Sequence, residues 1–228
     1  MKALFITATG TETGKTYVTA ALCRALTNKR QSVRVLKPVI SGFDDETAEN
    51  SDTYVLLRSL GPGFDQLPSP SAVEACSPWR FTEPLSPDMA ARREGREINF
   101  SKLMKFCREA QAGPEDVLLI EGIGGAMVPL DDTLTVLDWI KELGIPALVV
   151  AGSYLGTLSH TLTTVAAMRE RGVKIAGGVV SESEESPVPV AETVETIARF
   201  LKGIKIAAVA RNAEADVVLQ AVSEMAGF

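Results

Sequence analysis

A seven-residue stretch near the amino terminus constrains the fold more than any other part of the sequence. Gly10-Thr11-Glu12-Thr13-Gly14-Lys15-Thr16 follows the apolar run 3–6 and precedes the run 17–22, which suits a helix. Glycines in such a turn allow backbone N–H groups to point at phosphate oxygens, and the new helix adds its positive N-terminal end. A lysine there supplies charge to the outer phosphates, and a threonine hydroxyl can ligate magnesium. The stretch therefore predicts a phosphate-binding loop between a strand and a helix.

One position in this loop departs from the usual pattern. The pattern G-x-x-x-x-G-K-[ST] places its first glycine at position 9, where this chain has Thr9, and the glycine follows as Gly10. A tight turn that carries a solvated lysine is the alternative interpretation. The position of Gly-Lys-Thr at a strand-to-helix junction favours phosphate binding, and the shifted glycine leaves the curl of the loop open.

The overall composition narrows the class of protein. The 228 residues are 46% hydrophobic with a formal net charge of −6, which fits a globular chain and speaks against a nucleic-acid-binding surface. No run approaches membrane-spanning length, and no signal peptide is visible. The cysteines, Cys23, Cys76 and Cys107, match neither a disulfide framework nor a zinc site. We expect one domain over residues 1–228, in the cytoplasm, with no nucleic acid or membrane as its partner.

Apolar runs that suit strands alternate with helical stretches along the chain. Runs such as 117–120 and 147–150 are continuously apolar, as in a parallel sheet that is covered on both faces. The pattern predicts strands at 3–8, 33–37, 117–121, 146–151, 174–180 and 205–209, and helices at 15–29, 50–60, 87–94, 100–111, 134–142, 158–171, 188–202 and 214–225. This order predicts an α/β fold of the P-loop NTPase-like kind, a doubly wound, mostly parallel sheet with helices on both faces. Ligands then bind at the carboxyl ends of the strands.

Segment 61–88 does not fit this alternation. It contains six prolines, and proline breaks helices and interior strands. We expect a long ordered excursion over the sheet. Long loops in compact domains are often functional, but a plain surface insertion fits the composition equally well.

Charged residues stand at the ends of predicted strands or open the next helix. Lys37 precedes Pro38 at the end of the second strand, where it can reach between a nucleotide and a second substrate, although a surface lysine is the simpler interpretation of Lys37 alone. Asp52 stands near a helix start, where it could cap the helix or turn toward magnesium. Glu121 ends a buried apolar strand and precedes Gly122-Ile123-Gly124-Gly125. A carboxylate there requires a cation, so Glu121 is predicted to serve a nucleotide–magnesium site.

The loop 151–157 leaves another predicted strand. Thr157 or Ser159 could cap the helix that follows. His160, the only histidine, lies in the first turn of that helix, where a packing or surface role is the simpler interpretation. The sequence shows no cysteine–histidine or serine–histidine arrangement for covalent catalysis.

Taken in order, several motifs resemble those of the dethiobiotin synthetases. They are Thr11–Thr16, Lys37-Pro38-Val39-Ile40-Ser41-Gly42, Asn50-Ser51-Asp52, Phe81-Thr82-Glu83-Pro84-Leu85-Ser86-Pro87, Glu121–Gly125, and Asp132-Thr133 leading to Asp138-Trp139. The resemblance covers most of the chain and weakens after about residue 180. The stretches around Lys37 and Pro84 are more specific than the phosphate loop, which many nucleoside triphosphatases share.

The resemblance implies a reaction in biotin biosynthesis. Enzymes of that family are ligases that close the ureido ring of dethiobiotin from 7,8-diaminopelargonate, CO₂ and ATP, with Mg²⁺, and release ADP and phosphate. One amine captures CO₂ as a carbamate, the carbamate attacks the γ-phosphate, and the second amine closes the ring from the carbamic–phosphoric anhydride. The resemblance also implies a homodimer in which the segment matching Gly156-Thr157-Leu158-Ser159 helps to hold the carboxylate tail of the diamine across the interface.

The resemblance further implies which residues act. Lys15 and Lys37 are implied as the catalytic residues that neutralise the carbamate and the γ-phosphate. The implied magnesium ligands are Thr16, Asp52 and Glu121. The implied diamine-binding residues are Thr11, Glu12, Lys37, Ser41 and Ser159. The implied nucleotide-binding residues are Glu12, Thr13, Gly14, Lys15, Thr16, Tyr17, Asp52, Glu121, Gly122, Ile123, Gly124, Ser181, Glu182, Ala210, Arg211 and Asn212.

Several positions depart from the family pattern. Ala8 stands in place of a glycine, and Gly10 in place of an acidic residue. Ser159 replaces an asparagine that helps to bind the substrate tail, and Ser181 replaces the asparagine that usually reads the adenine. A proline of the family is missing near 210–212. The base site therefore departs most from the family.

Two other functions stay open at this point. An amide-forming enzyme similar to cobyrinic acid diamide synthase usually carries an added glutaminase domain, for which this chain has no room. A partitioning-type ATPase switch would show a basic surface and an extra lysine early in the phosphate loop. This chain is acidic, and the early positions are Thr9, Gly10 and Thr11.

Overall fold

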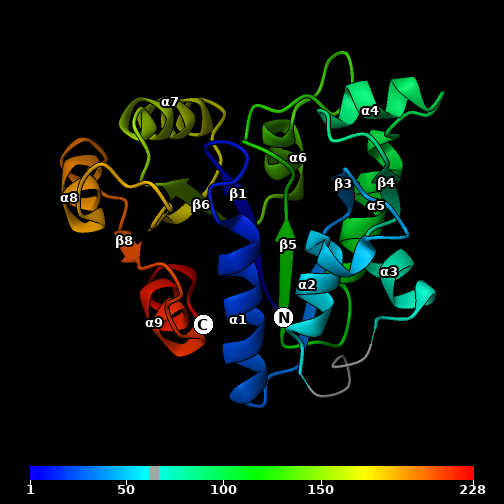
Figure 1. Ribbon diagram of the computed structural model, residues 1–228, viewed down its shortest axis with the longest axis horizontal. Helices are drawn as coiled ribbons and strands as arrows, with labels where there is room; N and C mark the ends of the chain where they lie inside the picture. Colours follow the sequence, from blue (N-terminus) through cyan, green and yellow to red (C-terminus); the bar gives the residue numbers. More distant parts are fainter. Residues whose placement is uncertain (62–66) are drawn as a thin grey trace.

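Six parallel strands form the central sheet of the protein (Figure 1). A computed structural model describes residues 1–61 and 67–228. The strands, in spatial order, are β2 (Val33–Leu36), β5 (Val117–Glu121), β1 (Lys2–Ala8), β6 (Ala147–Gly152), β7 (Ile175–Ser181) and β8 (Ile206–Val209). Each predicted strand is present with bounds within one residue of the prediction, and the predicted fold class is confirmed.

Strand β1 lies between β5 and β6 and buries side chains on both faces of the sheet. Leu4 and Ile6 join the core on one face, and Phe5 joins the core on the other. Phe5 meets Trp139 edge-to-face with ring centroids 4.8 Å apart. Because successive side chains of a strand alternate between faces, a strand with consecutive apolar residues such as Leu4, Phe5 and Ile6 requires cover on both faces of the sheet.

Helices cover the two faces of the sheet. On one face, α1 (Lys15–Asn28) and α9 (Ala215–Ala226) pack side by side, and α2 (Asp52–Arg58) joins the same core through Leu56 (Figure 1). The other core includes residues of α4 (Pro87–Arg93), α5 (Phe100–Gln111), α6 (Val136–Leu143), α7 (Thr157–Glu170) and α8 (Val190–Phe200). Asp138 in the first turn of α6 accepts the backbone N–H and the hydroxyl of Thr135, so this residue of the Asp138-Trp139 motif fixes a helix start.

The segment between β2 and α4 contains more regular structure than the sequence predicts. Strands β3 (Val39–Ser41) and β4 (Trp79–Phe81) pair in parallel as a second, small sheet, and α3 (Pro70–Cys76) lies between them in the chain. The predicted helix at 87–94 is confirmed as α4, whereas α3 and β4 were not predicted. Pro70 stands at the first turn of α3, as Pro87 does in α4. That position needs no N–H donor from proline. Residues 62–66 of this segment lie outside the described residues.

The parallel order brings the carboxyl ends of the strands to one edge of the sheet. The loops that leave β1, β5 and β7 therefore meet near the N-terminus of α1, as the sequence predicts for a ligand site. Among the described residues, none of the helices combines the length and the hydropathy that a membrane crossing requires.

Candidate active site

The loop between β1 and α1 turns sharply at two positions. Glu12 has φ of 56° and Gly14 has φ of 90°, both in the left-handed region. Gly14 also has no room for a side chain, since a Cβ there would lie 2.5 Å from the Ser181 hydroxyl. Thr9 is not among the residues with positive φ, so the position that usually carries glycine accepts a β-branched residue here.

The backbone after β5 packs directly against this loop. A Cβ at Gly125 would lie 3.2 Å from the backbone of Thr9 and of Gly10, and the N–H of Ala126 donates to the carbonyl of Ala8. The glycines after Glu121 thus allow two loops to approach each other closely, which is the purpose that the sequence predicts for them. Lys15 folds back over its own loop, with Nζ 3.2 Å from the carbonyl oxygen of Gly10.

Lys37 is the centre of a buried charge cluster. Its Nζ lies 2.7 Å from Glu121 Oε1, 3.0 Å from Asp52 Oδ2 and 2.9 Å from the carbonyl oxygen of Gly122. These three acceptors match the three N–H donors of an ammonium group. The side chain of Lys37 is 3% exposed, so the interpretation of Lys37 as a solvated surface lysine is wrong.

Asp52 faces this cluster from the first turn of α2. Ser51 is the N-cap residue, because its hydroxyl accepts the N–H of Tyr54, and Asp52 is therefore free to face Lys37. The side chain of Asp52 stays 42% exposed at the edge of the cluster, whereas that of Glu121 is fully buried. The capping role considered for Asp52 belongs to Ser51.

The environment shifts the pKa values of the two lysines in opposite directions. Burial, together with the positive charge of Lys37, lowers the pKa of Lys15 to about 8. Burial alone would also lower the pKa of Lys37, but Glu121 and Asp52 raise it above its ordinary value. The pKa of Asp52 is lowered, because its attraction to Lys37 outweighs the effect of burial. Lys37 is thus held as a cation, and an anion bound beside Lys15 would raise the pKa of Lys15 again.

The donor set beside Lys37 fits a magnesium ion. Thr16 Oγ1 donates to Glu121 Oε1 over 2.8 Å, which brings the three predicted ligands, Thr16, Asp52 and Glu121, to one point. Glu121 Oε2 is buried and has no hydrogen-bond partner in the described part of the chain, so it can accept a cation. Within the same residues, no cluster of three or more His, Cys, Asp or Glu side chains could bind a metal. Two carboxylates and a threonine hydroxyl suit magnesium, which is commonly held by one or two carboxylates plus phosphate oxygens and water.

A cavity of about 750 Å³ opens over these groups. Its lining contains twelve of the predicted residues, namely Thr11, Glu12, Thr13, Gly14, Lys15, Thr16, Tyr17, Lys37, Ser41, Asp52, Ile123 and Gly124. Glu121 and Gly122 contribute from beneath through their contacts with Lys37. The hydroxyl of Ser41 donates to the carbonyl of Leu85 over 2.7 Å, and its oxygen can still accept a donor from a ligand.

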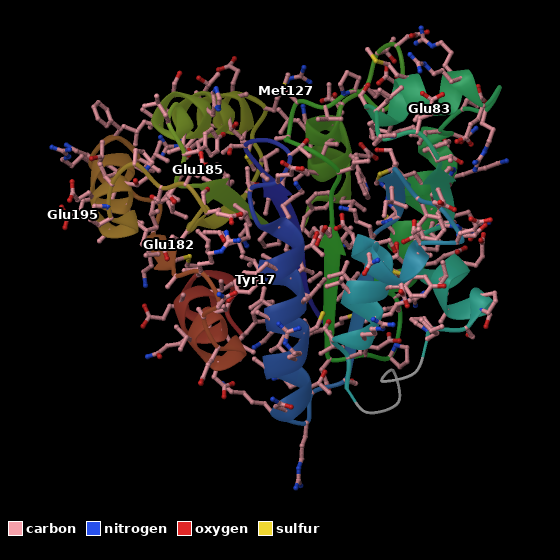
Figure 2. The ribbon with its side chains drawn as sticks, viewed as in Figure 1. Tyr17, Glu83, Met127, Glu182, Glu185 and Glu195 are labelled. Atoms are coloured by element: carbon pink, nitrogen blue, oxygen red, sulfur yellow. The ribbon has the colours of Figure 1, made fainter. Side chains whose placement is uncertain are left out.

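A second cavity of about 440 Å³ adjoins the first, with Glu12, Thr13, Gly14 and Tyr17 in both linings. Ser181, Glu182, Arg211 and Asn212 complete the predicted part of its lining. Tyr17 ties the loop after β8 to α1, since its hydroxyl donates to the carbonyl of Ala213 over 2.5 Å. Figure 2 shows Tyr17 and Glu182 on the side of the molecule where α1 and α9 lie.

Comparison with known proteins identifies the family. A family model described as an AAA domain matches residues 2–218. The ATP-dependent dethiobiotin synthetase of Acidiphilium cryptum is 48% identical over 201 residues, which cover 88% of this chain and 89% of the relative. This chain belongs to the dethiobiotin synthetase family. The enzyme of the same name from Methylobacterium nodulans is 45% identical over 93% of this chain and 94% of the relative. The family resemblance inferred from the motifs is confirmed.

Solved structures share the fold at much lower sequence identity. A chain of the MinC:MinD cell division complex of Aquifex aeolicus superposes with a TM-score of 0.61 at 14% identity, over 100% of this chain and 94% of that one. A ParA family ATPase of Chlorobium tepidum superposes with a TM-score of 0.54 at 12% identity, over 98% of this chain and 91% of that one. At these identities the likeness concerns the fold alone, which is that of the P-loop nucleoside triphosphatases.

Besides Glu121 and Gly122, which lie beneath the larger cavity, two positions that the dethiobiotin synthetase resemblance implies lie outside both cavities. Ala210 is exposed and is absent from either lining. Ser159 is exposed on α7 and is likewise absent, so the predicted contact of Ser159 with the diamine is not made within one copy of the chain. His160 accepts or donates one hydrogen bond with the Tyr154 hydroxyl, 2.8 Å from Nδ1, which fits the surface role predicted for it.

Sequence reasoning missed part of the walls of both cavities. The additional lining residues of the larger one are Ile40, Pro84, Leu85, Ser86, Pro87 and Val128, and those of the smaller one are Ser183 and Glu184. The Glu83-Pro84-Leu85-Ser86-Pro87 motif of the dethiobiotin synthetases contained the signal for four residues of the first group, and the motif that begins at Lys37 contained Ile40; no motif pointed to Val128. At least this part of the excursion lines the site, so the interpretation of 61–88 as a plain surface insertion is wrong there.

Proposed function

We propose that this protein closes the ureido ring of dethiobiotin from 7,8-diaminopelargonate, CO₂ and ATP, as a single domain over residues 1–228. Membership of the dethiobiotin synthetase family supports the proposal, and the buried cluster around Lys37 carries it. A carbamate and a γ-phosphate are both anions, and bringing them together requires fixed positive charge. Lys37 and Lys15 supply that charge in the wall of the same cavity.

The chemistry needs positioning more than it needs a covalent nucleophile. One amine of the substrate adds to CO₂ and loses a proton, which gives the carbamate. The carbamate oxygen attacks the γ-phosphorus and ADP leaves. The second amine then attacks the carbamate carbon, the C–O bond to phosphate breaks, and the amine loses a proton as phosphate leaves. Thr11, Glu12 and Ser41 line the cavity where they can orient the two amines by hydrogen bonds.

We assign magnesium to Thr16, Asp52 and Glu121. The orphaned Oε2 of Glu121 supports this assignment. A bound magnesium ion supplies charge neutralisation between the β- and γ-phosphates. Glu121 and Asp52 also hold Lys37, so the same two carboxylates fix the lysine next to the phosphates.

The direct test is product formation. The protein is incubated with the diamine, labelled bicarbonate, magnesium and ATP, and labelled dethiobiotin is expected together with one ADP per ring closed. EDTA in excess should abolish product formation, and added magnesium should restore it. ATP binding by a folded protein without any dethiobiotin would favour the amide-forming alternative instead.

We further propose that the active form is a homodimer. Ser159 lies outside both cavities of its own chain, and Leu155 and Leu158 beside it are exposed apolar residues. A second copy that covers this end of α7 would bury them and bring Ser159 to a neighbouring diamine site. Light scattering coupled to gel filtration should give twice the chain mass of 24.3 kDa.

Leu155→Glu should shift that mass toward the monomer and raise KM for the diamine, while the affinity for ADP stays unchanged. The matched control is Phe200→Glu, at an exposed apolar residue at the end of α8. A monomeric wild-type protein with full turnover would contradict the dimer proposal.

A further inference from the structure

The smaller cavity has the chemistry of a base-reading pocket, and its polar wall contains the carboxylates of Glu182 and Glu184 beside hydroxyl, amide and guanidinium groups. It shares four lining residues with the phosphate cavity, so a nucleotide with its phosphates at loop 10–16 can extend its base into it. Ser181, Glu182, Ser183 and Glu184 form a continuous stretch of this lining at the end of β7. Asn212 is the one amide side chain in the lining that the structure describes, and it is exposed.

Glu182 is the carboxylate that remains available in this wall. Its Oε2 accepts the backbone N–H of Arg211 over 3.0 Å, which holds the carboxylate at the cavity. Its Oε1 has no hydrogen-bond partner in the described part of the chain. The neighbouring Glu184 is paired instead with the Arg211 guanidinium, 3.3 Å away. Because each carboxylate oxygen accepts up to two hydrogen bonds, both oxygens of Glu182 can accept from a ligand.

The purines place different groups opposite such a carboxylate. The edge of guanine presents N1–H and the 2-amino group side by side, which are two donors for one carboxylate. The edge of adenine presents the 6-amino donor next to the N1 lone pair, so one carboxylate oxygen meets an acceptor. An unpaired acceptor-to-acceptor contact costs binding energy, which is how a polar site discriminates between ligands. The guanidinium of Arg211 in the same wall can donate to O6 of guanine.

We infer that Glu182 reads the base of the bound nucleotide and that the pocket accepts guanine nucleotides at least as well as adenine nucleotides. The inference rests on the proposed function only in that a nucleoside triphosphate binds at loop 10–16. It specifies the nucleotide class of that site, and it makes GTP a phosphoryl donor for this enzyme alongside ATP.

The test measures nucleotide binding without the diamine. Dissociation constants of the magnesium complexes of ADP, GDP and IDP are obtained by calorimetry, since IDP lacks only the 2-amino group of GDP. GDP should bind at least as tightly as ADP, and IDP about tenfold more weakly than GDP, as expected for loss of one of two paired hydrogen bonds. GDP binding that is more than about tenfold weaker than ADP binding would overturn the inference.

Substitutions assign the effect to one side chain. Glu182→Gln should weaken GDP relative to ADP by roughly tenfold to a hundredfold, because an amide presents one donor and one acceptor and so matches adenine. It should also remove the difference between GDP and IDP. The control is Glu195→Gln, which is remote on α8 (Figure 2), and Glu184→Gln in the same wall shows which of the two carboxylates is responsible. An unchanged GDP-to-ADP ratio in Glu182→Gln, or a larger change in Glu184→Gln, would contradict the role of Glu182.

Turnover separates this inference from the proposed function. Dethiobiotin formed with ATP and not with GTP would leave the function standing and refute the base reading. Tight GDP binding together with no dethiobiotin from either nucleotide would refute the function and leave the base reading intact.

Discussion

The side chain of Lys37 neutralises buried carboxylates and also lies in the wall of the proposed active site. Its ammonium group is buried with Glu121, and Asp52 pairs with the same ammonium from the exposed edge of the cluster. A buried ion pair adds little net stability, but removal of one partner leaves an uncompensated charge and is costly. The position of Lys37 is therefore fixed by the same carboxylates that we assign to magnesium.

Replacement of Lys37 should affect turnover and stability through separate causes. Lys37→Ala is expected to lower the rate of dethiobiotin formation by about 10²–10³-fold, through loss of a charge beside the γ-phosphate. It should also lower the free energy of unfolding by about 3–5 kcal/mol, because Glu121 stays buried without a counter-charge. Steady-state kinetics and chemical denaturation measure the two effects.

The double variant Lys37→Ala/Glu121→Gln tests that separation. It should recover much of the stability, since the buried charge is gone, and it should recover none of the turnover. Lys102→Ala, an exposed lysine on α5, is the control and should change neither quantity. Normal turnover of Lys37→Ala would refute the catalytic assignment.

At the scale of the elements, the sequence predicts the sheet well and the excursion poorly. Strands such as β5 and β6 are nearly continuous apolar runs, and local composition is enough to find the six strands of the main sheet. Strands β3 and β4 are three residues each and pair across 40 positions of sequence, so no local pattern identifies them. A helix that begins with proline, such as α3, is equally hidden among residues that usually break helices.

The candidate site was predictable to the extent that it is built from strand ends. Because parallel strands end at one edge, the order of β1, β2 and β5 brings Lys15, Lys37 and Glu121 together. Contributions that depend on the path of a loop were not predictable. The close approach of Gly125 to the backbone of Thr9 and Gly10 is one of these.

That contact between loops can be tested by adding a single methyl group. Gly125→Ala should weaken binding of ADP and lower kcat/KM by at least about tenfold, because the phosphate loop has to shift by a few tenths of an ångström. Gly144→Ala at the end of α6 is the control, since a Cβ there meets nothing within 4 Å. It should cost about 1–2 kcal/mol through its φ of 67° and leave nucleotide affinity unchanged. Equal ADP affinities in both variants would mean that the loop contact has no effect on the site.

At the scale of the whole molecule, the three cysteines are distributed over three hydrophobic clusters of the protein. Cys23 and Cys107 lie in the cores on opposite faces of the sheet, and Cys76 lies in the smaller cluster beneath the excursion. All three are free and buried. Burial raises the pKa of Cys23 and of Cys107 to about 12 and that of Cys76 to about 11.

The folded protein should therefore resist thiol reagents even at alkaline pH. A disulfide reagent such as DTNB should find no reactive thiol at pH 8 and three after unfolding in guanidinium chloride. The ordinary thiol pKa is 9.0, so between pH 9 and 11 the unfolded thiols ionise while the folded ones do not. The free energy of unfolding that the buried, protonated thiols contribute is therefore complete below pH 9, and it falls as the pH rises above 9. Rapid reaction of one thiol in the native protein would show that its core opens readily.

The course of α1 has a practical consequence for spectroscopy. The helix starts at the phosphate loop and ends at Asn28, and its 14 residues span about 21 Å at 1.5 Å per residue. Lys29 follows at the far end and is exposed. Because the native thiols are expected not to react, Lys29→Cys provides a single attachment point for a fluorophore or spin label in a chain that is otherwise unchanged. With a second label on a cysteine introduced near the mouth of the larger cavity, the distance between the two labels would report movements around the bound nucleotide, because α1 keeps the first label at a fixed distance from the phosphate loop.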